Sequence, residues 1–254
     1  MIKLKALLEK NLLATLLFNI KAFGLTKGLQ FPVYVYGHIK MNSIGNIVIK
    51  CPITRGLIKI GVNHETVAAP YTIFENKGTV EIYGRLLIGY GSVFNNSGTV
   101  ILRGNNLLSN KVELDIRTRL DVGENTFVGF ESHIYDSDFH NVVDVSTHRV
   151  YRNCAPIVLG KFNWFGGNTF IKKGTVTPNY LIVASPNSLL AKDYSTLPPY
   201  TVLAGCPAKP VKQGIRRIYN YTLDSEISNY FIQHPEEKYY QVDEQADLDD
   251  ICRY

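Results

Sequence analysis

The sequence predicts an all-β fold in which the chain winds into a stacked parallel β-helix. Between about residues 159 and 189 apolar residues recur at every sixth position, and small residues follow several of them. A helix repeats its apolar residues every 3.6 positions and a half-buried strand every 2, so a period of six indicates a chain that turns a corner every sixth residue. The small residues are expected to let the backbone turn tightly. The first column of this stretch is Leu159, Phe165, Ile171, Thr177, Val183 and Leu189, and its small followers are Gly160, Gly166 and Ala184.

The same six-residue beat occurs earlier in the chain. It is present at Ile82, Ile88, Phe94 and Val100, slips through residues 103–111, and resumes at Ile116, Val122, Val128 and Ile134. These segments predict further coils stacked in register on the first. The β-helix should therefore occupy residues 41–204, because a single coil cannot bury its apolar side alone and becomes stable only in a stack.

Residues 1–40 are predicted to form a helix and a strand that cap the amino-terminal end. Apolar residues from Leu4 to Leu16 fit one face of a helix that should end near Gly24. A membrane-surface anchor is the alternative reading of this helix, and it implies weak association with a lipid surface. Glu9 and Lys10 interrupt the apolar run and no small-residue cleavage site follows, so neither a signal peptide nor a membrane-spanning helix is expected.

The beat fails in residues 135–156, which are dense in Asp, His and Arg. A loop this long inside a compact domain is usually functional, and a β-helix otherwise offers smooth walls, so chemistry is expected here. Residues 205–254 should form a loop, helices and an acidic tail. A helix is expected through Ile227 and Phe231, ended by Pro235, with poor order beyond Glu236 unless a neighbouring subunit holds the tail.

The formal net charge of +5 is unevenly distributed. Residues 1–60 contain nine Lys or Arg and one acid, whereas residues 221–254 contain nine acids and two basic residues. No nucleic-acid reading motif accompanies the basic end, so we expect attraction to anionic substrates or to an anionic membrane face, and no nucleic-acid partner. The cysteines are scattered without a C-x-x-C pair, which favours free thiols and a cytoplasmic, reducing location. They are Cys51, Cys154, Cys206 and Cys252.

Four segments in order resemble the hexapeptide-repeat acetyltransferases, in particular the sugar O-acetyltransferases related to the maltose and galactoside enzymes. The resemblance covers residues 116–212 well, and it is our reason for expecting a left-handed β-helix, since crossovers between parallel strands are otherwise almost always right-handed. The segments are D-S-D-F-H at 136–140, P-I-V-L-G-K-F-N-W-F-G at 156–166, A-S-P-N-S-L-L-A-K-D at 184–193 and A-G-C-P-A-K-P-V-K at 204–212.

This resemblance implies direct transfer of an acetyl group from acetyl-CoA to a sugar hydroxyl, without an acyl-enzyme. His140 matches the histidine of the family that takes the hydroxyl proton, a role that suits the pKa of imidazole. Asp138 or Asp136 would accept the other imidazole N–H, and we prefer Asp138. His133 is expected to be structural, while His148 could touch the acceptor. A zinc site would need closely spaced ligands and a supporting shell, so no metal is expected.

The resemblance also implies a set of coenzyme-binding residues. Trp164 matches the tryptophan beside the pantetheine, Gly167 and Ser185 match two backbone donors, and the lysines match basic positions near the phosphates. The full set is Trp164, Gly167, Ser185, Lys192, Gly205, Pro207, Lys209 and Lys212. The sequence departs from the family at A-S-P-N-S, which is one residue longer than usual and places Pro186 where an N–H donor would be.

The predicted function is acetyl-CoA-dependent O-acetylation of a sugar or a surface glycan such as a capsule or O-antigen. The alternatives are an N-acetyltransferase of an amino-sugar nucleotide and a non-catalytic β-solenoid scaffold. Relatives in the family are homotrimers in which the loop of one subunit reaches the coenzyme groove of the next. We therefore expect a homotrimer with the site shared between subunits.

Overall fold

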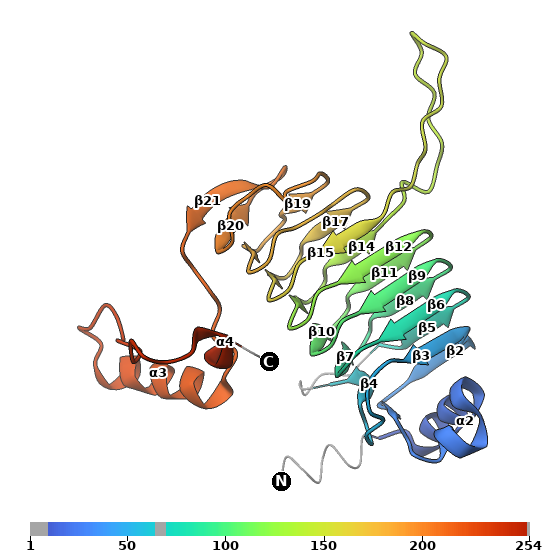
Figure 1. The fold of residues 1–254 in the computed structure, drawn as a ribbon, viewed down its shortest axis with the longest axis horizontal. Helices are drawn as coiled ribbons and strands as arrows, with labels where there is room; N and C mark the ends of the chain where they lie inside the picture. The colour runs from blue at the N-terminus through green and yellow to red at the C-terminus, as the bar shows by residue number, and fades with distance from the viewer. Residues whose placement is uncertain (1–9, 64–69, 253–254) are drawn as a thin grey trace.

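The computed structural model describes residues 10–63 and 70–252, and in it the chain forms a left-handed parallel β-helix with helices at both ends (Figure 1). This confirms the predicted fold class. Three sheets form the walls, and each coil contributes one strand to each sheet in turn. The predicted helical residues Leu4, Leu7 and Leu8 lie outside the described residues.

Sheet 1 has nine strands, all parallel except the last, which pairs antiparallel with its neighbour. In spatial order they are β1 (Val33–Val35), β4 (Ile58–Val62), β7 (Leu86–Gly89), β10 (Asn106–Leu108), β13 (Phe127–Val128), β16 (Trp164–Phe165), β18 (Ile182–Val183), β20 (Thr201–Ala204) and β21 (Lys209–Gln213).

Sheets 2 and 3 complete the prism and are entirely parallel. Sheet 2 contains β2 (Ile39–Ser43), β5 (Thr72–Asn76), β8 (Val93–Asn96), β11 (Glu113–Ile116), β14 (His133–Tyr135), β17 (Phe170–Lys172) and β19 (Leu189–Leu190). Sheet 3 contains β3 (Asn46–Ile49), β6 (Thr79–Ile82), β9 (Thr99–Leu102), β12 (Arg119–Val122) and β15 (Ile157–Leu159).

The length of the coils explains where the six-residue beat slips. In the middle of the β-helix Val80 pairs with Val100 and Val100 with Leu120, so each coil has 20 residues rather than 18. Two residues of each sheet 3 strand point inward, as Val100 and Leu102 do, and the apolar column therefore shifts by two positions per coil. Between β16 and β18 the coil shortens to 18 residues, because Trp164 pairs with Ile182, and there the beat is regular.

The predicted inward column after Leu159 holds except at its last position. Leu190 rather than Leu189 is fully buried, and it pairs with Ile171. The extra residue in the A-S-P-N-S turn advances the chain by one position, which turns Leu189 away from the core. The prediction that Leu189 points inward was therefore wrong.

The small residues of the second column have a different reason from the one expected. A Cβ on Gly160 would lie 2.3 Å from the carbonyl oxygen of Pro178, and one on Gly123 would lie 2.5 Å from the carbonyl carbon of Gly160. Close approach of the next coil therefore requires them. The left-handed corner conformation belongs to other residues, such as Asn168 at φ 56° and Asn187 at φ 60°.

Helix α2 (Leu12–Gly28) closes the amino-terminal end of the prism. Asn11 caps it by accepting a hydrogen bond from the N–H of Ala14. Phe18 is buried and packs edge-on against Phe74, which in turn stacks on Phe94 inside the coils. The helix continues past the predicted end, with a kink at Gly24, whose φ is 70°. No described helix is long and apolar enough to cross a membrane.

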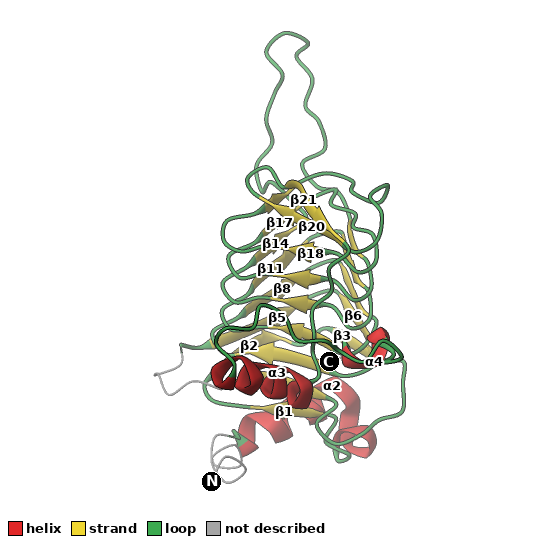
Figure 2. Ribbon diagram, turned by 90° about the vertical axis from the view of Figure 1, so that its left-hand side faces the viewer, coloured by secondary structure: helices red, strands yellow, loops and turns green. Residues whose placement is uncertain are grey.

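Residues 136–156 leave the coil between β14 and β15 and project from the prism as a long arm (Figure 2). Two antiparallel bridges, Ser137 with Cys154 and Val143 with Val150, join its two sides. At its tip Asp144 accepts hydrogen bonds from the N–H groups of Ser146 and Thr147. The arm packs on no other part of the described chain beyond its base, and its apolar side chains are largely exposed, as at Val145 (87%).

The carboxyl-terminal segment runs back beside the prism and ends in helices α3 (Tyr221–Gln233) and α4 (Leu248–Ile251). Asn220 caps α3, which ends before Pro235 as predicted from the position of that proline. No residue of α3 is buried. The expectation of poor order beyond Glu236 differs from what is observed, because α4 returns to the prism and Cys252 is buried against it.

Candidate active site

Trp164 lies on the outer face of sheet 1, where the strand register places it in a row of outward side chains. It pairs with Phe127 on one side and Ile182 on the other, and the row continues through Val202 to Lys212. Three inter-strand spacings separate Trp164 from Lys212, a distance of about 14 Å. An elongated ligand lying across these strands would thus meet an aromatic ring at one end and a cation at the other.

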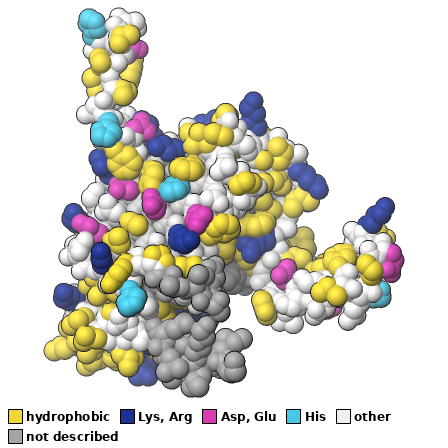
Figure 3. Space-filling model, turned by 180° about the vertical axis from the view of Figure 1, so that it is seen from behind, with side chains coloured by type: hydrophobic (Ala, Val, Ile, Leu, Met, Phe, Trp, Pro, Cys, Tyr) yellow, Lys and Arg dark blue, Asp and Glu magenta, His cyan; other side chains and the backbone are white. Residues whose placement is uncertain are grey.

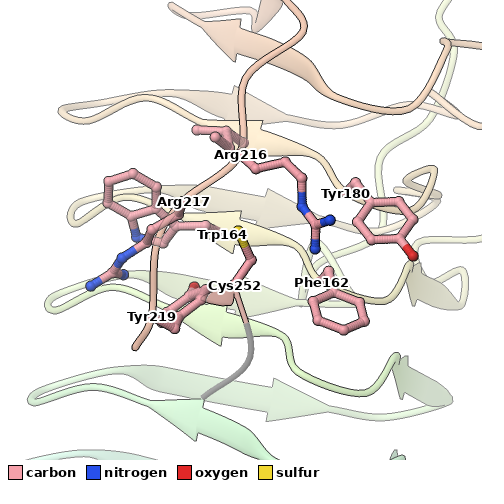
Figure 4. Close-up of a pocket in the computed structure, with 8 residues that line it drawn as sticks. Phe162, Trp164, Tyr180, Arg216, Arg217, Tyr219 and Cys252 are labelled. Atoms are coloured by element: carbon pink, nitrogen blue, oxygen red, sulfur yellow. The ribbon is translucent and has the colours of Figure 1, made fainter. Parts of the chain in front are cut away.

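The carboxyl-terminal segment covers Trp164, an arrangement that the sequence did not suggest (Figure 4). The Arg217 guanidinium lies 4.3 Å from the Trp164 ring centroid and 4.6 Å from that of Phe127. Tyr219 and Cys252 complete the wall, and the cavity between them is about 10 Å³, room for one water molecule. Burial raises the pKa of the Tyr219 hydroxyl and of the Cys252 thiol.

Arg216, next to Arg217, ties this segment to the corner of the coils. Its guanidinium lies 4.6 Å from the Tyr180 ring, which stacks on Phe162, and it forms a 2.7 Å ion pair with Asp249 of α4. The Tyr180 hydroxyl also donates to Asp249. These contacts hold α4 beside the Trp164 row. No motif marked them in the sequence, because they join residues about 70 positions apart.

Gly167 and Ser185 occupy the same corner in consecutive coils. The Ser185 hydroxyl donates to the Gly167 carbonyl at 2.8 Å, and a Cβ on Gly167 would lie 2.6 Å from the ring of Phe130. Within residues 10–63 and 70–252, neither the Gly167 N–H nor the Ser185 N–H donates a hydrogen bond. Two unused donors therefore lie on the corner at which the resemblance implies coenzyme contacts, and the longer turn leaves the Ser185 N–H in place.

The remaining predicted coenzyme residues lie on the last coil and the β20–β21 hairpin. Lys209 and Lys212 are exposed on β21, and Lys192 lies 5.2 Å from the Tyr194 ring centroid. Gly205 needs its left-handed φ of 94°, and its N–H donates to the Ser188 hydroxyl, so it shapes the hairpin. Pro207 follows in the same turn. None of the three lysines forms an ion pair among the described residues.

Asp136 is buried at the corner beneath the arm. Its carboxylate accepts hydrogen bonds from the N–H groups of Arg117, Thr118 and Arg119 at 2.6–3.0 Å and from the Thr118 hydroxyl. Asn96 fills the corresponding place two coils earlier and similarly binds the Gly98 N–H. The carboxylate of Asp136 is therefore used to hold the corner, and the structure does not bring it to His140.

Asp138 and His140 both lie exposed at the base of the arm. The Asp138 carboxylate forms ion pairs with Lys173 at 2.5 Å and Lys172 at 3.8 Å, and the His140 N–H donates to the Asp138 carbonyl at 2.7 Å. The His140 imidazole itself makes no hydrogen bond within the described part of the chain. The two residues are thus neighbours, but the predicted contact between carboxylate and imidazole is not formed in this single chain.

A cluster that the sequence did not reveal lies next to this base, on the outer face of sheet 2. His133 Nδ1 is 2.9 Å from the Tyr135 hydroxyl and 3.2 Å from Glu113, and its ring stacks on Phe170. Burial and a hydrogen bond to Glu113 raise the pKa of Tyr135. Tyr135 also packs edge-on against Phe139 of the arm. His133 thus supports the base of the arm. His148 lies exposed at the tip.

The residues described by the structure contain no group of three or more His, Cys, Asp and Glu side chains that could hold a metal ion. The outer face of the carboxyl-terminal coils instead offers aromatic rings, unused N–H groups and lysines. Such a surface suits a long organic anion.

Comparison with known proteins agrees with the fold. No protein-family model and no curated protein matches the sequence. Among solved structures, the polysialic acid specific acetyltransferase NeuO aligns over 82% of this chain and 87% of its own, with 18% identity and a TM-score of 0.55. The polysialic acid O-acetyltransferase OatWY aligns over 76% and 95%, with 19% identity and a TM-score of 0.46. AntD, an N-acyltransferase from Bacillus cereus solved with dTDP and coenzyme A, aligns over 80% and 89%, with 13% identity and a TM-score of 0.38. The chain therefore has the fold of the acetyltransferase NeuO.

Proposed function

We propose that the protein is an acetyl-CoA-dependent O-acetyltransferase that modifies a hydroxyl of a sugar or surface glycan. The observation that carries the proposal is the path on the outer face of the last coils. It runs from Trp164, past the unused N–H groups of Gly167 and Ser185, to the unpaired lysines of β21. The fold shared with NeuO, an acetyltransferase of polysialic acid by its description, supports a glycan as acceptor.

His140 is the proposed general base. The imidazole takes the proton of the acceptor hydroxyl while its oxygen attacks the thioester carbonyl carbon, and the C–S bond of the resulting intermediate then breaks. The thiolate leaves with the proton returned by the imidazolium, so no acyl-enzyme forms. Asp138 is the preferred partner of the imidazole, because the Asp136 carboxylate is already occupied by three backbone N–H groups. This role requires Asp138 to exchange its contact with Lys173 for one with His140.

The active form proposed is a homotrimer with the site between subunits. The arm that carries His140 projects from the prism, whereas Trp164 and the lysines lie on sheet 1 of the same chain (Figure 2). The exposed apolar residues of the arm would be covered by a neighbouring subunit; they are Val142, Val143, Val145, Val150 and Tyr151. A cytoplasmic location accompanies the proposal, since all four cysteines are free thiols, as expected in a reducing compartment.

The test follows the release of free coenzyme A thiol from acetyl-CoA with neutral, acidic and amino sugars and oligosaccharides as acceptors. Thiol release that requires a hydroxyl acceptor, with an ester in the product by mass spectrometry, would support the proposal. An amide product would identify an N-acetyltransferase of amino sugars instead. Absence of transfer together with absence of acetyl-CoA binding would leave a β-solenoid scaffold.

A further inference from the structure

Helix α2 has two apolar faces, and the cap of the β-helix uses only one of them. The inner face carries the buried Phe18, together with Asn19, whose side chain bonds both the N–H and the carbonyl of Val33. These contacts fix the orientation of the helix on the end of the prism. They also mean that the outer face is turned away from the core by the same geometry.

The outer face of α2 consists of leucines. Leu12 (73% exposed), Leu13 (68%), Leu16 and Leu17 follow the i, i+1, i+4, i+5 spacing that puts side chains on one side of a helix, and Ile20 lies half-buried on the same side. Leu25 and Leu29 add two more exposed leucines beyond the Gly24 kink. Single exposed leucines are ordinary, but six on one element form a continuous patch that indicates an interaction surface. Hydrophobic side chains gather over this end of the molecule in Figure 3.

The surroundings of this leucine face are basic. Residues 10–63 contain seven Lys or Arg and no Asp or Glu, and Lys21 and Lys27 are on α2 itself. None of the seven forms an ion pair among the described residues. Two copies of such a surface would repel each other, whereas the negative charge of an anionic lipid layer complements it.

We propose that the outer face of α2 binds an anionic membrane surface, with the helix lying in the plane of the interface. The leucines would enter the boundary between headgroups and acyl chains while the lysines contact the headgroups, as in other amphipathic surface helices. Capping and membrane binding are then properties of opposite faces of one helix. The arm projects from the other end of the prism (Figure 2), and Trp164 lies five inter-strand spacings, about 24 Å, from β1. The proposed acetyl transfer would therefore take place away from the lipid surface.

The experiment is co-sedimentation of the whole protein with vesicles of phosphatidylcholine, alone or mixed with phosphatidylglycerol. We expect binding to the anionic vesicles that weakens with salt. The variant Leu12→Gln/Leu13→Gln/Leu16→Gln should lose at least about tenfold in affinity, since each leucine gives up apolar burial, and Lys21→Glu/Lys27→Glu should lose roughly fivefold per lysine. A matched control, Ile232→Gln/Leu248→Gln, removes exposed apolar residues of the carboxyl-terminal helices and should bind as the wild type does.

Circular dichroism and light scattering of every variant complete the test. Wild-type protein that binds neither type of vesicle, or leucine variants that bind like the wild type, would overturn the proposal. A fall in oligomeric state in the leucine variants would also overturn it, and would assign the face to contacts between copies of the chain. Vesicle binding has its own readout, so it stands or falls independently of acetyl transfer.

Discussion

The middle coils and the carboxyl-terminal coils share one architecture but use their charges differently. Between residues 72 and 134, five of the six Lys and Arg side chains form ion pairs with acids of the same or a neighbouring coil, as Arg103 and Arg119 do with Asp121. Between residues 157 and 213, four of the six lysines form none with the rest of the described chain; they are Lys161, Lys192, Lys209 and Lys212. In the middle coils the charges stabilise the stack, whereas the last coils keep positive charge available for a ligand.

The arm marks the boundary between these two regions. Before it, coils of 20 residues repeat with Asn side chains bonding the backbone at one corner, as Asn76 and Asn96 do. After it, the coils shorten, and aromatic residues such as Phe162 and Tyr180 take the left-handed corner positions. Regular stacking leaves little room for chemistry, so the irregular part of a β-helix is where a site is expected.

The largest expected effect belongs to the arm. His140→Ala should lower the rate of acetyl transfer by roughly 10² to 10⁴-fold, because it removes the proposed base, while circular dichroism and acetyl-CoA binding stay close to wild type. The exposed His234 at the end of α3 provides the matched control, and His234→Ala should leave the rate unchanged. A rate for His140→Ala within about threefold of wild type would remove His140 from this role.

Complementation tests whether the arm and the last coils form one site across subunits. His140→Ala and Gly167→Trp should each be inactive, the second because a side chain at Gly167 meets the ring of Phe130 and fills the corner. After subunit exchange, a mixed trimer can pair an intact arm with an intact corner, so part of the activity should return. Proven exchange without recovery would confine the site to one chain, and a fully active monomer would exclude a shared site.

A smaller effect is expected from the unpaired lysines. Lys209→Ala and Lys212→Ala should each raise the Michaelis constant for acetyl-CoA by roughly threefold to tenfold, with little change in turnover at saturation. Contacts to remote phosphates are similar in the ground and transition states, so they affect binding rather than chemistry. Lys111→Ala removes a lysine that is paired with Glu131 and should leave both constants unchanged. Turnover that falls while the Michaelis constants stay fixed would contradict the mapping.

The smallest effect concerns the paired charges of the middle coils. Burial of the Asp121 carboxylate opposes its ionisation, but hydrogen bonds from Arg103 and Arg119 outweigh this and lower its pKa. A lowered folded-state pKa gives stability that is present above the ordinary pKa of about 4 and is lost as the pH falls below it. Asp121→Asn should therefore lower the free energy of unfolding by about 1–2 kcal/mol at pH 7. The difference between the two proteins should shrink towards pH 3, and a difference independent of pH would show that packing is responsible instead.

Local patterns in the sequence determined the β-helix and many of the candidate residues. The six-residue beat predicts coils because only a chain that turns at every sixth residue puts Phe165, Ile171 and Val183 on one inner surface. The break in that beat located the arm, and the motif residues lie along the last coils, as the order of the four segments suggested. These features depend on neighbours in the chain or on positions one coil apart, so they can be read from spacing alone.

Other features depended on contacts between distant segments, and only the tertiary structure decided them. One extra residue in the turn before Ser188 brought Leu190 instead of Leu189 into the core. Asp136, equal to Asp138 in the motif, was committed to the backbone of residues 117–119. Arg217 was laid on Trp164 and Arg216 on Tyr180 by a segment that returns from beyond the last coil. Helix periodicity showed that α2 is apolar, but which leucines the cap buries depends on Phe18 entering the prism at Phe74, a packing contact that no local pattern encodes.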